Sequence, residues 1–146
     1  MTYDSLIKSG RIRPYQATNQ EIHKILALAK RDIGAAIRNL AEDPEWAYNI
    51  AYNAILQACR ALMLAEGYRA RGIDHHAIVF EFAREALGSE HITTFLRIDL
   101  IRRTRNKVVY DIPGLVSPSM AKDVIQLAES LLEIIETRLT GQTRLA

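Results

Sequence analysis

Five segments of this chain repeat apolar residues at steps of three and four, which is the spacing of one helix face, and helix start or stop signals bound each segment. No segment alternates apolar and polar residues as a half-buried strand does. Short connections make successive helices antiparallel. The sequence therefore predicts an all-α fold, an antiparallel up-and-down helical bundle of four to five helices.

Helix boundaries are indicated by capping residues. The TNQE run at Thr18 to Glu21 is a capping box and predicts a helix to about residue 41. Asp43 followed by Pro44 predicts a second helix that reaches roughly Gly67, rich in alanine and tyrosine and the most buried in character.

The later helices are predicted from the same signals. The third spans 74–88, with Asp74 as its cap. A fourth opens at Ser89 or Thr93 and ends near residue 110, before a Pro-Gly pair. The fifth runs over 117–139, with a glycine beyond its end.

Composition bounds the size and the electrostatics of the molecule. With 146 residues, 49% hydrophobic and 25% charged, we expect one globular domain over residues 1–146, in which residues 1–17 form an irregular or short helical lead-in that drapes over the bundle. The formal net charge is +2. Bulk charge therefore does not drive tight nucleic-acid binding, and any attraction for phosphate must be local.

Cysteine use and hydropathy point to a compartment. Cys59 is the single cysteine, so no intrachain disulfide can form, and its apolar helical surroundings predict that it packs as a small hydrophobe. The first residues lack a basic region followed by an apolar run, and no uncharged stretch is long enough to span a bilayer. We expect a cytoplasmic protein with no membrane partner.

The fourth helix carries the sharpest signal. On a helical projection, Ile98 and Ile101 fall on one side and Asp99 and Arg103 on the other. Arg105 lies near the middle of the apolar stripe, where a lone guanidinium is costly unless it is paired or faces a wet cleft. Two interpretations remain open: a structural arginine paired with a carboxylate of a neighbouring helix, or an anion-binding residue.

The histidines and acidic residues of the sequence do not form a metal-binding pattern. The chain has no Glu-x-x-His pair of the kind that di-iron bundles use. His75 and His76 are adjacent, so they cannot both ligate one metal from a regular helix, and we expect them to serve loop packing or solvent contact. No Gly-rich phosphate loop is present. The sequence predicts no metal site and no cofactor.

The run RNKVVYD in the fourth helix, the segment AYNIAYNAILQACRALMLAEGY and the His75–His76 pair together resemble the HEPN domains of prokaryotes and higher eukaryotes. The resemblance covers most of the chain. It implies an all-α bundle that dimerises and, in ribonuclease members, an arginine followed four to six residues later by a histidine at a shared cleft. Arg105 matches the arginine, and Tyr110 stands in the place of the histidine. Ile112 stands where some toxin members carry a tyrosine.

The exchange of histidine for tyrosine affects chemistry more than binding. RNA cleavage without a metal needs a base for the ribose hydroxyl and an acid for the leaving oxygen, and an imidazole with a pKa of about 6.5 suits both roles. A phenol, with a pKa of about 10, is a poor base at neutral pH. The resemblance implies Arg105 and Tyr110 as the candidate catalytic residues. The candidate RNA- or phosphate-binding residues are Arg102, Arg103 and Asn106.

Two functions from different classes follow. The first is a cytoplasmic homodimer that binds RNA or a nucleotide phosphate. If this protein is also catalytic, we expect a weak metal-independent ribonuclease of the toxin–antitoxin type. The resemblance then implies a minimal nucleotidyltransferase as the antitoxin partner. The alternative is a non-catalytic HEPN interaction module that keeps the bundle and has lost the activity. In a third interpretation, the chain is a generic bundle in which Arg105 closes a buried ion pair.

Overall fold

The computed structural model describes residues 3–72, 75–110 and 114–145, with the backbone alone for residues 108–110 and 142–145. In chain order its elements are α1 (Asp4–Lys8), β1 (Ile12–Pro14), α2 (Asn19–Asn39), α3 (Pro44–Ala65), β2 (Tyr68–Ala70), α4 (His75–Leu87), the short 3-10 helix η1 (Ser89–His91), α5 (Ile92–Tyr110) and α6 (Pro118–Leu145). Helices make up most of the described chain, so the prediction of an all-α fold is confirmed.

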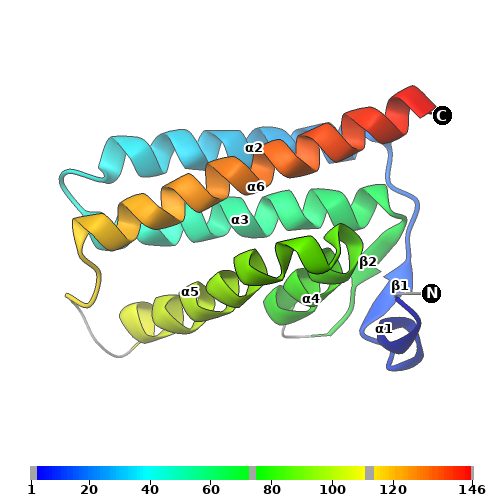
Figure 1. The fold of residues 1–146 in the computed structure, drawn as a ribbon, viewed down its shortest axis with the longest axis horizontal. Helices are drawn as coiled ribbons and strands as arrows, with labels where there is room; N and C mark the ends of the chain where they lie inside the picture. The colour runs from blue at the N-terminus through cyan, green and yellow to red at the C-terminus, as the bar shows by residue number, and fades with distance from the viewer. Residues whose placement is uncertain (1–2, 73–74, 111–113, 146) are drawn as a thin grey trace.

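The central element is α3, which packs against α2, α4, α5 and α6. Figure 1 shows α2, α3 and α6 as three long helices side by side, with α4 and α5 along the opposite side of α3. The long helices alternate in direction along the chain, as short connections require. Small buried residues such as Ala51 and Ala58 let the neighbours approach α3 closely.

Both of the first helix starts are confirmed. The Thr18 hydroxyl accepts a hydrogen bond from the Glu21 backbone N–H at 3.1 Å, and Glu21 Oε1 accepts one from the Thr18 N–H at 3.1 Å. Asp43 caps α3 by accepting from the Trp46 N–H at 3.0 Å, with Pro44 as the first helical residue. These bonds satisfy backbone donors that have no partner within the helix.

The lead-in is more regular than the sequence indicated. It contains α1 and the strand β1, which pairs antiparallel with β2 so that Ile12 faces Ala70. The short helix α1 fits the expected irregular or short helical lead-in, whereas the strand was not expected, because three-residue strands are too short to show alternation. The lead-in does drape over the bundle: Leu6 is buried, and the Tyr3 ring stacks on the Phe82 ring of α4 at 4.2 Å between centroids.

The end of the last helix differs from the sequence prediction. The last helix continues to Leu145, past Gly141, which the sequence analysis placed beyond its end. A glycine near an open helix end costs only about 1 kcal/mol relative to alanine, so it need not stop the helix. At the start of α4, the predicted cap Asp74 lies outside the described residues.

Two expectations from composition can be compared with the structure. Cys59 is fully buried among apolar side chains, as predicted, and this burial raises the pKa of its thiol. Among the described helices, none combines the length and the apolar character needed to cross a membrane.

Candidate functional site

Arg105 lies where α3, α4 and α5 meet. Its guanidinium carbon is 5.4 Å from the centroid of the Tyr52 ring, which is in the range of a cation–π contact. Tyr52 belongs to α3 and is 1% exposed, so the ring is a fixed platform. The Tyr52 hydroxyl is 2.8 Å from Nδ1 of His76, in the first turn of α4. We call Tyr52, His76 and Arg105 the Arg105 cluster.

Sequence spacing explains how α3 supports this cluster. Tyr48 and Tyr52 are one turn apart and therefore share a face of the helix. Tyr48 is buried and its hydroxyl is hydrogen-bonded with Thr104, the residue before Arg105. Burial raises the pKa of Tyr48, and the bond with Thr104 lowers it by less. Tyr48 therefore stays neutral at physiological pH and helps to hold α5 against α3.

The polar atoms of Arg105 are incompletely satisfied. Nη1 donates to the Asn106 side-chain oxygen at 3.4 Å, a long hydrogen bond. Nε is buried and has no hydrogen-bond partner. Within the part of the chain that the structure describes, no carboxylate forms an ion pair with Arg105. A half-buried guanidinium in this state is one that an incoming anion would stabilise.

The neighbouring arginines differ from Arg105 because each has an acidic partner. Asp99 is 3.1 Å from Arg102 and 2.6 Å from Arg103, at helical spacings of three and four residues. Arg103 is well exposed. The charges of Arg102 and Arg103 are therefore partly neutralised within α5. Their proposed phosphate contacts remain predictions that would require release from Asp99.

The other predicted site residues are placed as follows. Asn106 is exposed and adjoins Arg105. Tyr110 is the last residue of α5, and its side chain lies outside the described residues, as does Ile112 altogether. The apolar side of α5 is as predicted where it is described, since Ile98 and Ile101 are buried. The catalytic role of Tyr110 stays a prediction.

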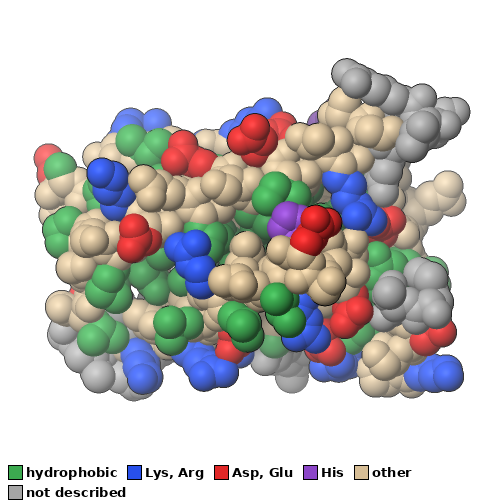
Figure 2. All heavy atoms as spheres, viewed as in Figure 1, with side chains coloured by type: hydrophobic (Ala, Val, Ile, Leu, Met, Phe, Trp, Pro, Cys, Tyr) green, Lys and Arg blue, Asp and Glu red, His purple; other side chains and the backbone are tan. Residues whose placement is uncertain are grey.

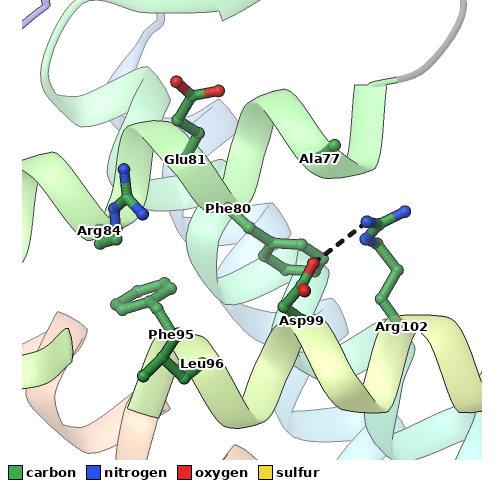
Figure 3. Close-up of a pocket in the computed structure, with 8 residues that line it drawn as sticks. All are labelled: Ala77, Phe80, Glu81, Arg84, Phe95, Leu96, Asp99 and Arg102. Atoms are coloured by element: carbon green, nitrogen blue, oxygen red, sulfur yellow. Dashed lines mark hydrogen bonds and ion pairs between the residues drawn. The ribbon is translucent and has the colours of Figure 1, made fainter. Parts of the chain in front are cut away.

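A groove lies between α4 and α5. It has a volume of about 420 Å³ and combines apolar and charged walls. Figure 3 shows Ala77 and Arg102 at one end and Arg84 and Phe95 at the other. Ala77 follows His76 in α4, and Arg102 lies one turn before Arg105 in α5. One end of the groove is therefore close in sequence to two residues of the Arg105 cluster.

Sequence reasoning missed His76 and Tyr52. The expectation that His76 serves loop packing or solvent contact was wrong, because it is half-buried and bonded to a buried tyrosine of another helix. An adjacent histidine pair at a helix start and two tyrosines one turn apart were visible in the sequence. Their meeting depends on how α3 and α4 pack, which periodicity does not encode.

The described residues contain no group of three or more histidine, cysteine or acidic side chains that could hold a metal ion. In the Arg105 cluster, an arginine packs on the Tyr52 ring and the His76 imidazole is bonded to the hydroxyl of that ring. This combination is suited to binding an oxyanion and to exchanging a proton near the bound anion.

Comparison with known proteins places this geometry in a family. The family model described as the HEPN domain matches residues 22–138, which run from α2 into α6 and include the whole Arg105 cluster. No curated protein sequence matches the chain. The match covers well over half of the molecule, and its all-α architecture agrees with the helical bundle described above. This chain belongs to the HEPN domain family.

Proposed function

We propose that this protein binds the phosphate groups of RNA or of a nucleotide at Arg105. The observation that supports this function is the state of the guanidinium, which rests on the Tyr52 ring and has no carboxylate partner within the described residues. Its neighbours Arg102 and Arg103 both pair with Asp99. Membership of the HEPN family is consistent with a module that acts on nucleotides or RNA.

Binding uses the geometry of the side chain. A guanidinium presents a planar fork of N–H donors that matches two oxygens of a phosphate, and the buried Nε is one donor that still lacks a partner. The Asn106 side chain, now 3.4 Å from Arg105 Nη1, would turn its amide group toward a second phosphate oxygen. The Tyr52 ring keeps the guanidinium in place before the ligand arrives.

The test is binding of a labelled short single-stranded RNA, measured by fluorescence anisotropy for the wild type, Arg105→Ala and the matched control Arg103→Ala. We expect Arg105→Ala to weaken binding about tenfold or more, and to lower the slope of affinity against salt by about one phosphate contact. Arg103→Ala removes an exposed cation that Asp99 already neutralises, so we expect a smaller loss. Equal affinities of all three proteins would contradict the proposal.

His76 favours a second, catalytic candidate, a weak metal-independent ribonuclease. Its imidazole lies beside the same Tyr52 ring that carries Arg105, at 5.7 Å between ring centroids. An imidazole can take a proton from a ribose hydroxyl at neutral pH, whereas the phenol of Tyr110 is a poor base. In this version, Arg105 holds the scissile phosphate and His76 accepts the proton of the ribose 2′-hydroxyl as that oxygen attacks the phosphorus. The 5′-oxygen leaves as the cyclic phosphate forms, and it takes a proton from water.

Cleavage assays in EDTA separate this candidate from the non-catalytic interaction module. If His76 is the base, His76→Gln should abolish cleavage and keep RNA binding, and the control His75→Gln should leave both unchanged. A wild type that binds RNA and shows no cleavage would favour the interaction module. Cleavage that appears only in Tyr110→His would show that this chain has the scaffold and lacks the histidine of the ribonuclease motif.

We also propose that the protein acts as a cytoplasmic homodimer in a toxin–antitoxin setting, with a minimal nucleotidyltransferase as antitoxin. The support for a dimer is an exposed apolar face on α5, formed by Ile92, Leu96 and Leu100 at four-residue spacing. Growth arrest on expression, relieved by a nucleotidyltransferase encoded beside it, is the expected outcome. Normal growth at high expression would contradict the toxin role.

A further inference from the structure

A second pocket lies apart from the Arg105 cluster. It forms where the start of α2, the end of α3, β2 and the start of α4 meet, and its volume is about 430 Å³. His75 lines this pocket, while the next residue, His76, contacts Tyr52 in the Arg105 cluster. The two histidines therefore serve different places in the fold. Pockets of about 300 to 1,000 Å³ are the size that small-molecule ligands occupy.

One wall of the second pocket is aliphatic. It consists of Ile25 from α2, Met63 and Leu64 from α3, and Val79 from α4. Met63 and Val79 are almost fully buried, so this wall is continuous with the core. Ile25 and Leu64 are half-buried and keep part of their surface in contact with the pocket. Water against such a wall is displaced favourably by an apolar group.

The second pocket is also lined by three basic residues, Arg60, Arg69 and His75. Arg60 is half-buried in the last turns of α3. No hydrogen bond or ion pair joins Arg60 to another residue within the described ranges 3–72, 75–110 and 114–145. A partly desolvated guanidinium next to an apolar wall is costly unless an anion joins it.

Glu21 is the acidic residue among the described side chains that line the pocket, and its oxygens are already used. Oε1 accepts from the Thr18 backbone N–H at 3.1 Å, and Oε2 accepts from the Tyr15 hydroxyl at 2.8 Å. The hydrogen bond from the Thr18 backbone, followed by that from Tyr15, lowers the pKa of Glu21. The carboxylate is thus held by the helix cap and by Tyr15, and within the described residues it forms no ion pair with Arg60.

The ring of Tyr15, which also lines the pocket, is in contact with two arginines. The Arg69 guanidinium carbon lies over its ring at 5.1 Å from the centroid, and that of Arg13 at 6.0 Å. A ligand would therefore meet the aliphatic wall with its apolar part, because an arginine already packs on the aromatic ring. Arg69, held by Tyr15, adds positive charge at the rim without blocking Arg60.

We propose that the second pocket binds a small organic anion, with a single carboxylate or phosphate head group between Arg60 and His75 and an apolar body against Ile25, Met63, Leu64 and Val79. Arg60 supplies a two-pronged contact to the head group, and the aliphatic wall selects for the body. The ligand is amphipathic, so inorganic phosphate alone binds weakly. This site is independent of RNA binding at Arg105.

Isothermal titration calorimetry with octanoate, adenosine monophosphate, inorganic phosphate and 1-octanol tests the proposal on the full chain. We expect saturable binding of octanoate or of the nucleotide, and the stronger of the two identifies a carboxylate or a phosphate head group. Octanol lacks the charge and phosphate lacks the apolar body, so each should bind about tenfold more weakly or not measurably.

Variants connect the binding to this pocket. Arg60→Gln should weaken binding of the anion about tenfold or more, and Arg60→Lys should weaken it less, because one charged donor remains. Arg38→Gln, which removes an exposed arginine of α2 outside the pocket, is the matched control and should bind as the wild type does. Circular dichroism confirms that each variant is folded.

The result that overturns the proposal is anion binding that is absent in the wild type, or equal in folded Arg60→Gln and wild type. Arg105→Ala separates this proposal from the proposed function. It should keep anion binding in the second pocket while losing RNA affinity, and Arg60→Gln should show the reverse pattern.

Discussion

A guanidinium packed on an aromatic ring keeps its charge while it loses water on one face. At Arg105 the Tyr52 ring replaces that water, and the carboxylate expected of a structural arginine is absent from the described residues. An exposed cation–π contact is worth about 0.5 to 1 kcal/mol and a desolvated one about 2. The side chain is therefore held in position with little contribution to folding.

This balance gives a prediction for stability. Arg105→Met should change the free energy of unfolding by no more than about 2 kcal/mol, because it removes a cation–π contact and strands no buried charge. Breaking a buried ion pair would cost about 3 to 5 kcal/mol. Urea denaturation measures the difference, with Arg103→Met as the exposed control. A loss above about 3 kcal/mol would restore the interpretation of Arg105 as a structural ion-pair partner.

Cys59 provides a second prediction at the level of single residues. Burial raises the pKa of its thiol, so the reactive thiolate is scarce in the native protein at neutral and mildly alkaline pH. An aromatic disulfide reagent should therefore react with Cys59 only as fast as the chain opens, and rapidly in urea. Because the folded pKa is raised, stability should be complete below the ordinary thiol pKa of about 8.5 and fall as the pH rises above it. Fast native-state labelling would contradict this burial.

Among the elements, α6 is tied to the ends of two others by one side chain. Arg138 donates from Nη1 to the Ala86 carbonyl of α4 at 2.7 Å and from Nη2 to Glu66, just after α3, at 2.6 Å. The Ala86 carbonyl is a backbone acceptor near the C-terminal end of α4, where the helix dipole also favours a cation, and the Glu66 carboxylate forms an ion pair with Arg138. The contact spans three elements that are far apart in sequence.

Replacing this residue should loosen α6. Arg138→Met keeps the apolar stem and removes two charge-assisted hydrogen bonds, so we expect the free energy of unfolding to fall by about 1.5 to 3 kcal/mol. Thermal and urea denaturation measure the change. Lys30→Met is the control, because the ion pair of Lys30 with Glu136 is exposed and should be worth less than about 1 kcal/mol. Equal effects of the two variants would contradict the role of Arg138.

Helices were predictable because their information is local. The capping box at Thr18 and the Asp43-Pro44 pair place the starts of α2 and α3, and the structure has both. The pairing of β1 with β2 was not predictable, since two three-residue strands more than fifty positions apart carry no periodic signal. The end of α6 was misplaced because a glycine at an open helix end lowers stability without forbidding helix.

For the candidate site, the sequence indicated Arg105 and not its surroundings. A charged residue on an apolar stripe is visible in a helical projection. That the stripe meets Tyr52, and that Tyr52 meets His76, depends on the packing of three helices. The ion pairs of Asp99 with Arg102 and Arg103 were within reach of sequence reasoning, because the spacings of three and four residues place them on one helix face.

At the scale of the whole molecule, α5 has two apolar faces, one packed in the core and one exposed. Ile98 and Ile101 pack into the core, while Ile92, Leu96 and Leu100 point outward and are 50%, 65% and 63% exposed. Figure 2 shows hydrophobic side chains interspersed with basic ones over α5 on this face. Burying a leucine side chain is worth about 1.5 to 3 kcal/mol, so a partner that covers this outward row would gain free energy of association from it.

A second copy of the chain is the occupant that we expect on this face. A two-fold axis brings the same patch of both subunits together, so one apolar row on α5 suffices for a self-complementary contact. We predict that the wild type sediments at twice the mass of the chain and that Leu96→Glu with Leu100→Glu sediments as a folded monomer, because each pairing would then bury carboxylates. Ile37→Glu is the control, since Ile37 is 51% exposed on α2, away from this row. A monomeric wild type at every concentration, or dissociation by Ile37→Glu alone, would contradict pairing through α5.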